Sequence, residues 1–223
     1  VSAAQTTITS NTGSITTDGS ATITVQAKDQ FGNNLTASGG TVVLGTTLGA
    51  LTAVTDNTNG TYTATLTSTS VGSATISGSI AGNAITDTEV VTVTAGGASL
   101  TTSQVTVADA SIVAGTNTTV TVQLRDAGNN PLTASAGTVA LNVSGVGSVG
   151  TVTDNANGTY TATYTSNVTG SATISATLNS QAITDDASVT VTPAAVSAAQ
   201  TTITSNTGSI TAGGNATITV QAK

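Results

Sequence analysis

The sequence predicts an all-β chain made of tandem two-sheet sandwiches, with about seven strands in each. Three observations support this prediction: a long internal repeat, strict alternation of apolar and polar residues, and turn residues between the alternating runs. The alternating runs are rich in valine, isoleucine and threonine, whose branched side chains favour strands and resist helices. No stretch of the sequence has the periodicity of a helix of useful length.

The repeat is visible at two distances along the chain. Residues 1–28 return almost letter for letter at residues 196–223, an offset of 195. The segment VTDNTNGTYTATLTS from Val54 returns as VTDNANGTYTATYTS from Val152, an offset of 98. A period of roughly 100 residues suits a self-sufficient domain and is too long for a solenoid repeat. The sequence therefore predicts three segments: a first unit at residues 1–97, a second unit at residues 98–195, and the first two strands of a third unit at residues 196–223.

The first four strands of the first unit are expected near residues 4–10, 20–28, 41–47 and 50–56. The first of them ends at the turn sequence SNTG. The second contains SATITVQ, in which alanine, isoleucine and valine share one face and two threonines and a glutamine share the other. The second strand is followed by the polar loop DQFGNN, and the fourth by DNTNG. Such alternation is typical of half-buried strands in an antiparallel sheet.

The last three strands of the first unit are expected near residues 61–68, 73–80 and 84–94. The fifth strand carries TYTATLT, in which tyrosine, alanine and leucine oppose four threonines. The Asn-Gly pair just before it suits the positive φ values of a tight hairpin turn. The turn sequence AGN separates the sixth strand from the seventh, and the second unit repeats the whole plan in the same order.

Charge and composition exclude several functional classes. The chain has 3 lysine and arginine residues against 10 acidic ones, a net charge of −7, so it offers no basic patch for nucleic acid or an anionic membrane surface. It has no histidine and no cysteine, which excludes a Ser–His or Cys–His catalytic pair and any disulfide. No apolar run approaches the roughly 20 residues that span a membrane. The sequence predicts a chain that is not an enzyme and does not insert into a membrane in this segment, with targeting and anchoring segments lying outside it.

The turn before the fifth strand is the best candidate for a metal site. It offers oxygen ligands for calcium in both units, at Asp56, Asn57, Asn59, Asp154, Asn155 and Asn157. Calcium prefers about six to eight oxygen ligands, and neither turn has the D-x-[DN]-x-[DN]-G pattern followed by a glutamate. Because Asx side chains in turns usually bond to their own backbone, we expect no cofactor, with calcium at these turns as the alternative.

Two blocks of the sequence resemble a known family. The segments TITVQAKDQFGNNLTASGGTVVL and VTDNTNGTYTATLTS resemble the bacterial immunoglobulin-like repeats that stand in tandem in the stalks of invasin- and intimin-type adhesins. The resemblance covers both full units and the partial third. It implies tandem immunoglobulin-like β-sandwiches, extracellular display at the bacterial cell surface, and a spacer or adhesive role. The second unit departs from the pattern at DAGNNP (126–131), where the loop glycine stands one position earlier, so the geometry of this loop stays open.

Three aromatic residues have structural interpretations. Tyr62 and Tyr160 occupy the same G-T-Y-T-A pattern in the two units. Immunoglobulin-like sandwiches often hold a tyrosine whose hydroxyl bonds to a nearby backbone group, so a buried ring with its hydroxyl tied to a turn is expected at both positions. Phe31 stands in a polar loop, where we expect it to cap the end of the sandwich or to pack at a domain junction, with a ligand contact as the alternative.

The junctions between the units are short, with TAGGAS at residues 94–99 and TPAAVS at residues 192–197. Neighbouring units should therefore lie nearly end to end, and Gly96–Gly97 should hinge more than the Pro-Ala-Ala segment at 193–195. Two strands are only marginally stable alone. We therefore expect residues 196–223 to be ordered only where they dock on the second unit or on another chain.

Together these observations predict a structural spacer in the stalk of a large bacterial surface adhesin or extracellular fibre, with neighbouring repeats as its partners and any host-surface ligand bound through other domains. The near-identity of the first and third units suits a rod built from interchangeable copies of one unit. The two copies differ only at Thr17/Ala212, Asp18/Gly213 and Ser20/Asn215. Two alternatives stay open. One is an adhesive module that binds host glycan or protein through Phe31 or the turn at 56–60. The other is a filament subunit whose incomplete third unit pairs with a strand of an identical chain.

Overall fold

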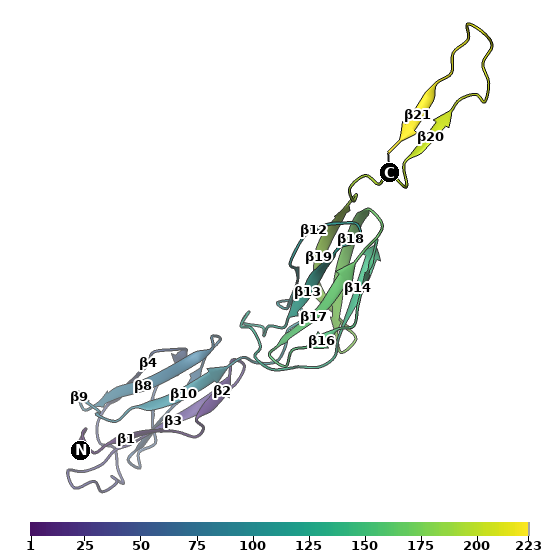
Figure 1. The fold of residues 1–223 in the computed structure, drawn as a ribbon. Helices are drawn as coiled ribbons and strands as arrows, with labels where there is room; N and C mark the ends of the chain where they lie inside the picture. The colour runs from purple at the N-terminus through teal and green to yellow at the C-terminus, as the bar shows by residue number, and fades with distance from the viewer. Residues whose placement is uncertain (223) are drawn as a thin grey trace.

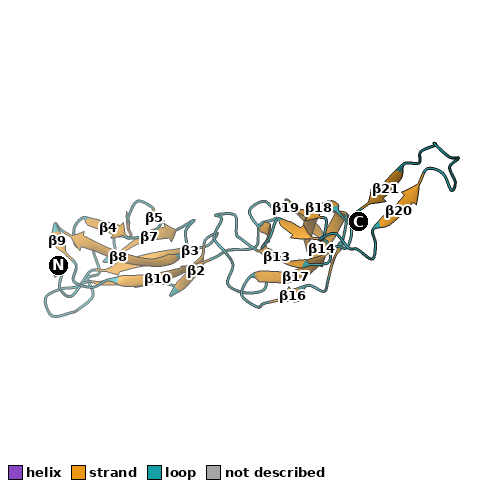
Figure 2. Ribbon diagram, turned by 45° about the horizontal axis from the view of Figure 1, so that its top comes forward, coloured by secondary structure: helices purple, strands orange, loops and turns teal. Residues whose placement is uncertain are grey.

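Every regular element in residues 1–222, the part of the chain that the computed structural model describes, is a β-strand (Figure 1). The strands form two sandwiches and a C-terminal hairpin, which follow one another along an elongated particle (Figure 2). The prediction of an all-β fold made of tandem sandwiches is confirmed. None of the described residues belongs to a helix long and apolar enough to cross a membrane.

The first sandwich consists of two five-stranded sheets. One sheet has the order β1 (Thr7–Ser10), β3 (Ser20–Gln26), β7 (Thr61–Thr67) and β5 (Ala50–Leu51), with β6 (Thr55–Asp56) also paired to β7. The other has the order β2 (Ser14–Thr16), β10 (Glu89–Thr94), β8 (Gly72–Ile80) and β4 (Val42–Thr46), with β9 (Asn83–Ala84) also paired to β8.

The second sandwich repeats this topology. Its first sheet has the order β11 (Gln104–Val107), β13 (Asn117–Gln123), β17 (Thr159–Thr165) and β15 (Ser148–Val149), with β16 (Thr153–Asp154) also paired to β17. Its second sheet has the order β12 (Ser111–Val113), β19 (Gln181–Thr192), β18 (Gly170–Leu178) and β14 (Val139–Gly145).

The expected first strand, near residues 4–10, is followed by a short strand that the alternation did not reveal. A kink separates the two, in which the Ser10 hydroxyl donates to Thr12 O at 2.6 Å and the Thr12 hydroxyl donates to Ser14 O at 2.9 Å. After the kink the chain leaves the sheet of β1, and β2 joins the opposite sheet parallel to β10, with Ser14 beside Thr92. β12 pairs with β19 in the same way. These two pairs are parallel, whereas the alternation of residues indicated antiparallel pairing.

Two other expected strands of the first unit are interrupted. Between β5 and β6, the Thr52 hydroxyl accepts the Thr65 N–H at 2.9 Å, so a side chain takes over a bond that a backbone carbonyl would make in a continuous ladder. The expected strand near residues 84–94 divides into β9 and β10, whereas β19 runs without a break over the corresponding part of the second sandwich.

Each sandwich has a core of its own, formed by the apolar faces that the alternation predicts. In the first sandwich Ile23, Leu66 and Ile76 are completely buried, and in the second Val122 and Ile174 are. The two cores are separate clusters. Because burial of apolar surface is the main source of stability, the two sandwiches are expected to fold independently.

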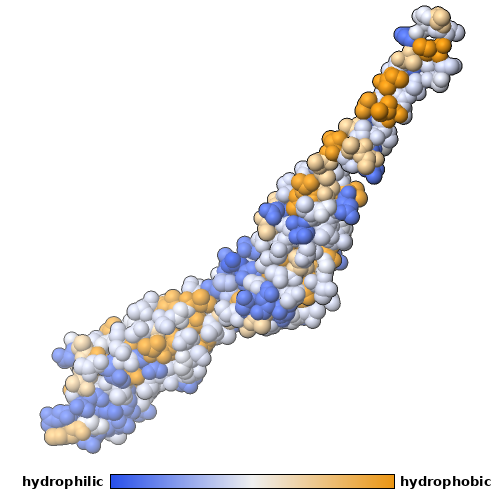
Figure 3. Space-filling view, viewed as in Figure 1, coloured by the Kyte–Doolittle hydropathy of each residue, from blue (hydrophilic) through white to orange (hydrophobic). Residues whose placement is uncertain are grey.

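The partial third unit forms a hairpin of two strands, β20 (Thr202–Ser205) and β21 (Ile218–Gln221). Its apolar side chains are uncovered, as Figure 3 shows: Ile203 and Val220 are 72% and 61% exposed, whereas their counterparts Ile8 and Val25 are at most 1% exposed. The hydrogen bonds found within residues 196–222 all stay inside that segment. The hairpin thus has half of a sandwich core without its other half, and the expectation that it needs a docking partner for order in solution stays a prediction.

Candidate functional site

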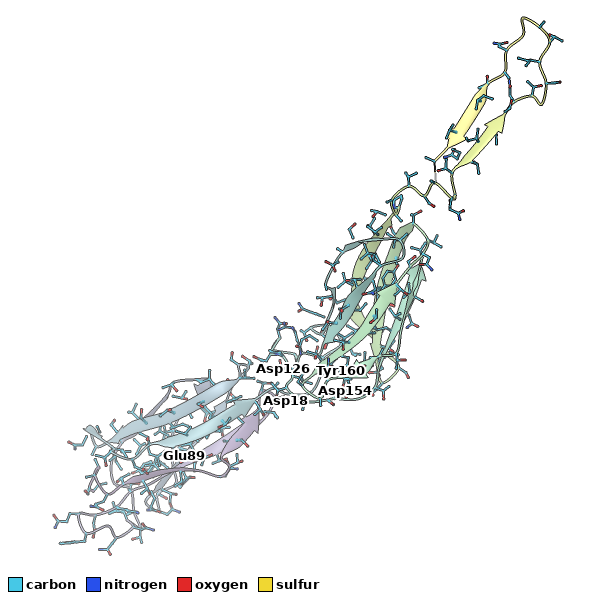
Figure 4. The ribbon with its side chains drawn as sticks, in the orientation of Figure 1. Asp18, Glu89, Asp126, Asp154 and Tyr160 are labelled. Carbon is cyan, nitrogen blue, oxygen red and sulfur yellow. The ribbon has the colours of Figure 1, made fainter. Side chains whose placement is uncertain are left out.

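The two sandwiches meet around the carboxylate of Asp126 (Figure 4). Asp126 follows β13, and it is only 1% exposed although it lies at the end of a sandwich. Beside it is a hollow of about 210 Å³, lined by Thr17, Thr69 and Gly96 of the first sandwich and by Asp126 and Gly128 of the second. Since the hollow is shared between the two sandwiches, its geometry depends on how they are joined.

Two donors from the first sandwich bind one oxygen of this carboxylate. The Thr17 hydroxyl, in the turn between β2 and β3, donates to Asp126 Oδ2 at 2.6 Å. The Gly96 N–H, in the connector after β10, reaches Asp126 Oδ2 at 3.1 Å and Thr17 Oγ1 at 3.0 Å. Hydrogen bonds to an ionised acceptor are roughly twice as strong as those between neutral groups. The carboxylate therefore ties both the turn and the connector of the first sandwich to the second.

A second contact lies next to the first. The Asn130 side-chain amide donates to Thr69 O, in the loop after β7, at 2.9 Å. Between Asp126 and Asn130 stands Gly128, where an added Cβ would lie 2.5 Å from Thr69 O and 2.8 Å from Asn130 Nδ2. Because real Cβ contacts essentially never fall below 3.0 Å, glycine is what allows this loop to approach the first sandwich so closely.

The loop that carries Asp126 is also held within its own sandwich. The Asn130 N–H donates to Asp126 Oδ1 at 2.8 Å, and the Thr102 hydroxyl donates to Asp126 O at 2.6 Å. The first unit has the same kind of loop, in which the N–H groups of Phe31 and Asn33 donate to Asp29 Oδ1 at 2.8 and 2.9 Å. The aspartate is thus a loop-forming residue in both units, and in the second it gains partners from a neighbouring sandwich.

The protonation of Asp126 reflects these contacts. Burial on its own raises the pKa of this carboxyl, but hydrogen bonds from the Thr17 hydroxyl, from the Asn130 N–H and side-chain amide, and from the Gly96 N–H outweigh burial and lower the pKa from 3.8 to about 2. Hydrogen bonds from the side chain and main chain of Asn33 lower the pKa of Asp29 as well. Asp126 is therefore ionised at neutral pH, although it is enclosed.

The pH dependence of stability is expected to report on Asp126. Because its folded-state pKa of about 2 lies below the ordinary 3.8, the unfolded chain takes up the proton first. The ionised carboxylate stabilises the folded state fully above about pH 4, and this contribution is lost as the pH falls towards about 2. In a calorimetric series, Asp126→Asn should therefore flatten the fall in melting temperature of the second sandwich across this range. Asp109→Asn, at an exposed position of the same sandwich, is the control, and an equal flattening there would contradict the assignment.

The calcium candidates lie in the turns before β7 and β17, where several of their oxygens accept hydrogen bonds from the same turn. Asp56 Oδ1 accepts the Thr58 N–H at 2.8 Å, and Asn59 Oδ1 accepts the N–H and the hydroxyl of Thr61 at 3.1 and 2.7 Å. The Asn57 side-chain amide donates to Thr61 Oγ1 at 3.0 Å. The second unit repeats these bonds at Asp154, Asn155 and Asn157. Within residues 1–222, no three acidic side chains gather closely enough to hold a metal ion.

Tyr62 and Tyr160 have buried rings and hydroxyls that bond to a loop. The Tyr62 hydroxyl donates to Gly40 O at 2.8 Å and accepts the Gly39 N–H at 2.7 Å. The Tyr160 hydroxyl makes the equivalent pair of bonds at 2.9 and 3.2 Å. Each hydroxyl therefore satisfies two backbone groups in the loop before β4 or β14.

In each sandwich, one further carboxylate connects the two sheets. Asp87 Oδ2 accepts the N–H of Ile8 in β1, and Asp185 Oδ2 accepts the N–H of Val105 in β11, both at 2.8 Å. β1 and β11 are the outer strands of their sheets. An outer strand with free N–H groups can pair with another chain, and these aspartates occupy one such group on each.

Sequence reasoning did not reveal the junction site, because its parts are far apart along the chain. Thr17 and Gly96 are separated from Asp126 by 109 and 30 residues. One signal was present: the three differences between the first and third units fall at residues 17, 18 and 20, in the turn between β2 and β3 and at the first residue of β3. The hydrogen bonds of the Gly96 N–H also argue against the expected hinge at Gly96–Gly97.

Comparison with known families gives two matches within the chain. A family model described as invasin, domain 3, matches residues 2–96 and again residues 99–194. No protein among the curated sequences is significantly similar to the chain.

Three solved structures are similar over most of the chain. Invasin, described as a bacterial integrin-binding protein, is 28% identical over 92% of this chain and 42% of its own, with a TM-score of 0.60. InvD of Yersinia pseudotuberculosis is 29% identical over 93% of this chain and 64% of its own, with a TM-score of 0.58. FdeC, an Escherichia coli adhesin, is 27% identical over 100% of this chain and 74% of its own, with a TM-score of 0.65. The chain thus spans less than two thirds of the invasin and InvD structures.

Proposed function

Because the chain belongs to the invasin domain 3 family, we propose that it is a spacer segment in the stalk of a bacterial surface adhesin. The observation that carries this proposal is the end-to-end placement of the two sandwiches, joined through a buried carboxylate (Figure 4). A segment whose units are linked in this way holds its two ends apart, and a stalk needs that property.

The dimensions of the units support the same role. The longest strand of the first sandwich, β8, has 9 residues, which at about 3.3 Å per residue spans about 30 Å. The N-terminus lies at one end of the particle and the C-terminal hairpin at the other (Figure 2). Because each sandwich has its own core, the number of units sets the reach of the stalk.

The chemistry of the chain supports a role without catalysis. It has no histidine and no cysteine, and the carboxylate with the largest pKa shift, Asp126, is enclosed by donors from the protein itself. The filament alternative receives little support at β1 and β11, where Asp87 and Asp185 occupy outward N–H groups.

A combined scattering and adhesion experiment tests the spacer role. Small-angle X-ray scattering of the full chain should give the profile of an elongated particle, and beads coated with the chain should not adhere to host cells. The contrary result is saturable adhesion that is lost in Phe31→Ser. Phe31 is the matched probe because it is 79% exposed in an end loop. Loss of adhesion in this variant would reveal an adhesive module.

We also propose that the chain needs no calcium, because one carboxylate oxygen of Asp56 and the side-chain oxygen of Asn59 accept an N–H and a hydroxyl of their own turn, as their equivalents in the second unit do. Millimolar calcium should leave the melting temperatures of both sandwiches unchanged relative to a sample in chelator. A rise that disappears in Asp56→Asn for the first sandwich, or in Asp154→Asn for the second, would show that these turns hold the ion.

A further inference from the structure

We propose that Thr17, Gly96, Asp126 and Gly128 form a selective latch between neighbouring sandwiches, and that the residues at positions 17 and 128 decide which junctions of the array are fixed. The latch has a donor end on the first sandwich, made of the Thr17 hydroxyl and the Gly96 N–H. It has an acceptor end on the second, made of the Asp126 carboxylate and the bare backbone at Gly128.

The donor end is particular to the first unit. The backbone places Thr17 and Ala114 equivalently, since the Thr17 N–H donates to Thr94 O at 3.0 Å and the Ala114 N–H donates to Thr192 O at 2.8 Å. In the third unit the same position is Ala212. Alanine has no hydroxyl, so the second and third units cannot supply the 2.6 Å bond that Thr17 makes to the carboxylate.

The acceptor end is particular to the second unit. Gly128 and Phe31 are equivalent, because each stands two residues after the aspartate that begins its loop. At Gly128 even a single added Cβ would lie 2.5 Å from Thr69 O of the neighbouring sandwich. A phenylalanine at that position cannot be accommodated in the same pose, so the loop of the first unit cannot receive a preceding sandwich as the loop of the second unit does.

The differences in sequence between the first and third units also point to this contact. Residues 1–28 and 196–223 are otherwise identical, yet their three differences are confined to residues 17–20, the turn that carries Thr17 together with the first residue of β3. The third unit has Ala-Gly-Gly-Asn in this turn, which matches Ala-Gly-Thr-Asn of the second unit in three of four residues. The latch therefore forms where a unit with threonine at the position of Thr17 is followed by a unit with glycine at the position of Gly128. An array of such units combines fixed pairs of sandwiches with more mobile junctions.

This inference deepens the proposed spacer role and rests on it for its purpose, but the latch itself can be measured whatever the chain binds. Because the protein has no cysteine, Ser77→Cys and Ser175→Cys give two unique sites for spin labels. Both serines are exposed, and they occupy matching positions on β8 and β18. Double electron–electron resonance on the full chain then reports the distribution of distances between the two sandwiches.

The expected result is a narrow distribution for the labelled parent and for Thr17→Ser, which keeps the hydroxyl. Thr17→Val and Asp126→Asn should each broaden it, with the population outside the main peak rising roughly tenfold, as expected for loss of a hydrogen bond to a charged group. Gly128→Ala should broaden it as well, because the added Cβ would lie 2.5 Å from Thr69 O. Circular dichroism melts establish that each variant is folded.

Asp29→Asn is the matched control, because it alters the same kind of loop at a place where no sandwich is docked. Its distribution should equal that of the parent. The latch is overturned if Thr17→Val stays as narrow as the parent, if Thr17→Ser broadens as much as Thr17→Val, or if Asp29→Asn broadens as much as Asp126→Asn. None of these results depends on whether the chain adheres to cells, so the latch and the spacer role fail separately.

Discussion

Gly60→Ala is expected to lower the free energy of unfolding of the first sandwich by at least about 3 kcal/mol. Gly60 has a φ of 85°, and a Cβ there would lie 1.9 Å from Leu35 O and 2.5 Å from Leu35 C. Leu35 cannot move away easily, because its N–H donates to Ala27 O, and the Ala27 N–H donates to Gly60 O, both at 2.9 Å. Calorimetry should show the melting transition of the first sandwich lowered by roughly 12 °C or more.

Two other glycines separate the causes of this effect. Gly82 has a similar φ of 79° with no atom within 4 Å of an added Cβ, so Gly82→Ala tests backbone strain alone and should cost about 1 kcal/mol. Gly158 repeats the close approach in the second unit, 2.1 Å from Leu132 O, and Gly158→Ala should lower the second transition and leave the first unchanged. Equal effects of Gly60→Ala and Gly82→Ala would show that the close approach to Leu35 is unimportant.

Tyr160→Ala is expected to destabilise the second sandwich by about 3–5 kcal/mol, because it removes a large buried ring. Tyr160 is 2% exposed and belongs to the core of that sandwich. Its hydroxyl donates to Gly137 O and accepts the Ala136 N–H, so truncation also leaves two backbone groups without a partner. Urea unfolding followed by tyrosine fluorescence and circular dichroism should show the loss.

Tyr160→Phe separates the hydroxyl from the ring. It keeps the packing and removes the two hydrogen bonds, and the expected cost is about 1–3 kcal/mol. Tyr62→Ala is the matched change in the first sandwich, where Tyr62 is 1% exposed. Each alanine variant should shift the transition of its own sandwich only. A shift of both transitions together by either variant would contradict the independence of the two cores.

Much of the fold follows from local patterns, and these were predictable. Strands such as β3, β7 and β8 are recognisable because one face is apolar throughout, and the prediction placed each within one or two residues of its observed bounds. The short strand β2 was missed because its three residues are too few to show alternation. The resemblance to invasin-type repeats, stated from two sequence blocks, is confirmed by the family match over both units.

The junction was less predictable, for a physical reason. A hydrogen bond between Thr17 and Asp126 is made between two folded domains, and no sequence period connects the two positions. The sequence indicated that the loop at Asp126 repeats the loop at Asp29 with its glycine one position earlier, but this shift alone did not reveal that one loop is docked and the other is not. That difference depends on Gly128 and Phe31, whose importance emerges only when Thr69 of the neighbouring sandwich is placed beside the loop.

The parallel pairs β2–β10 and β12–β19 determine how the chain responds to tension. In each sandwich a strand near the start of the unit lies beside the last strand, with Ser14–Thr16 opposite Thr92–Thr94 and Ser111–Val113 opposite Thr190–Thr192. Pulling the two ends of a unit apart slides such neighbours past each other, so the bonds of the ladder are loaded in shear and must break together. A chain of such units resists unfolding under tension through its unfolding rate, which governs survival under force.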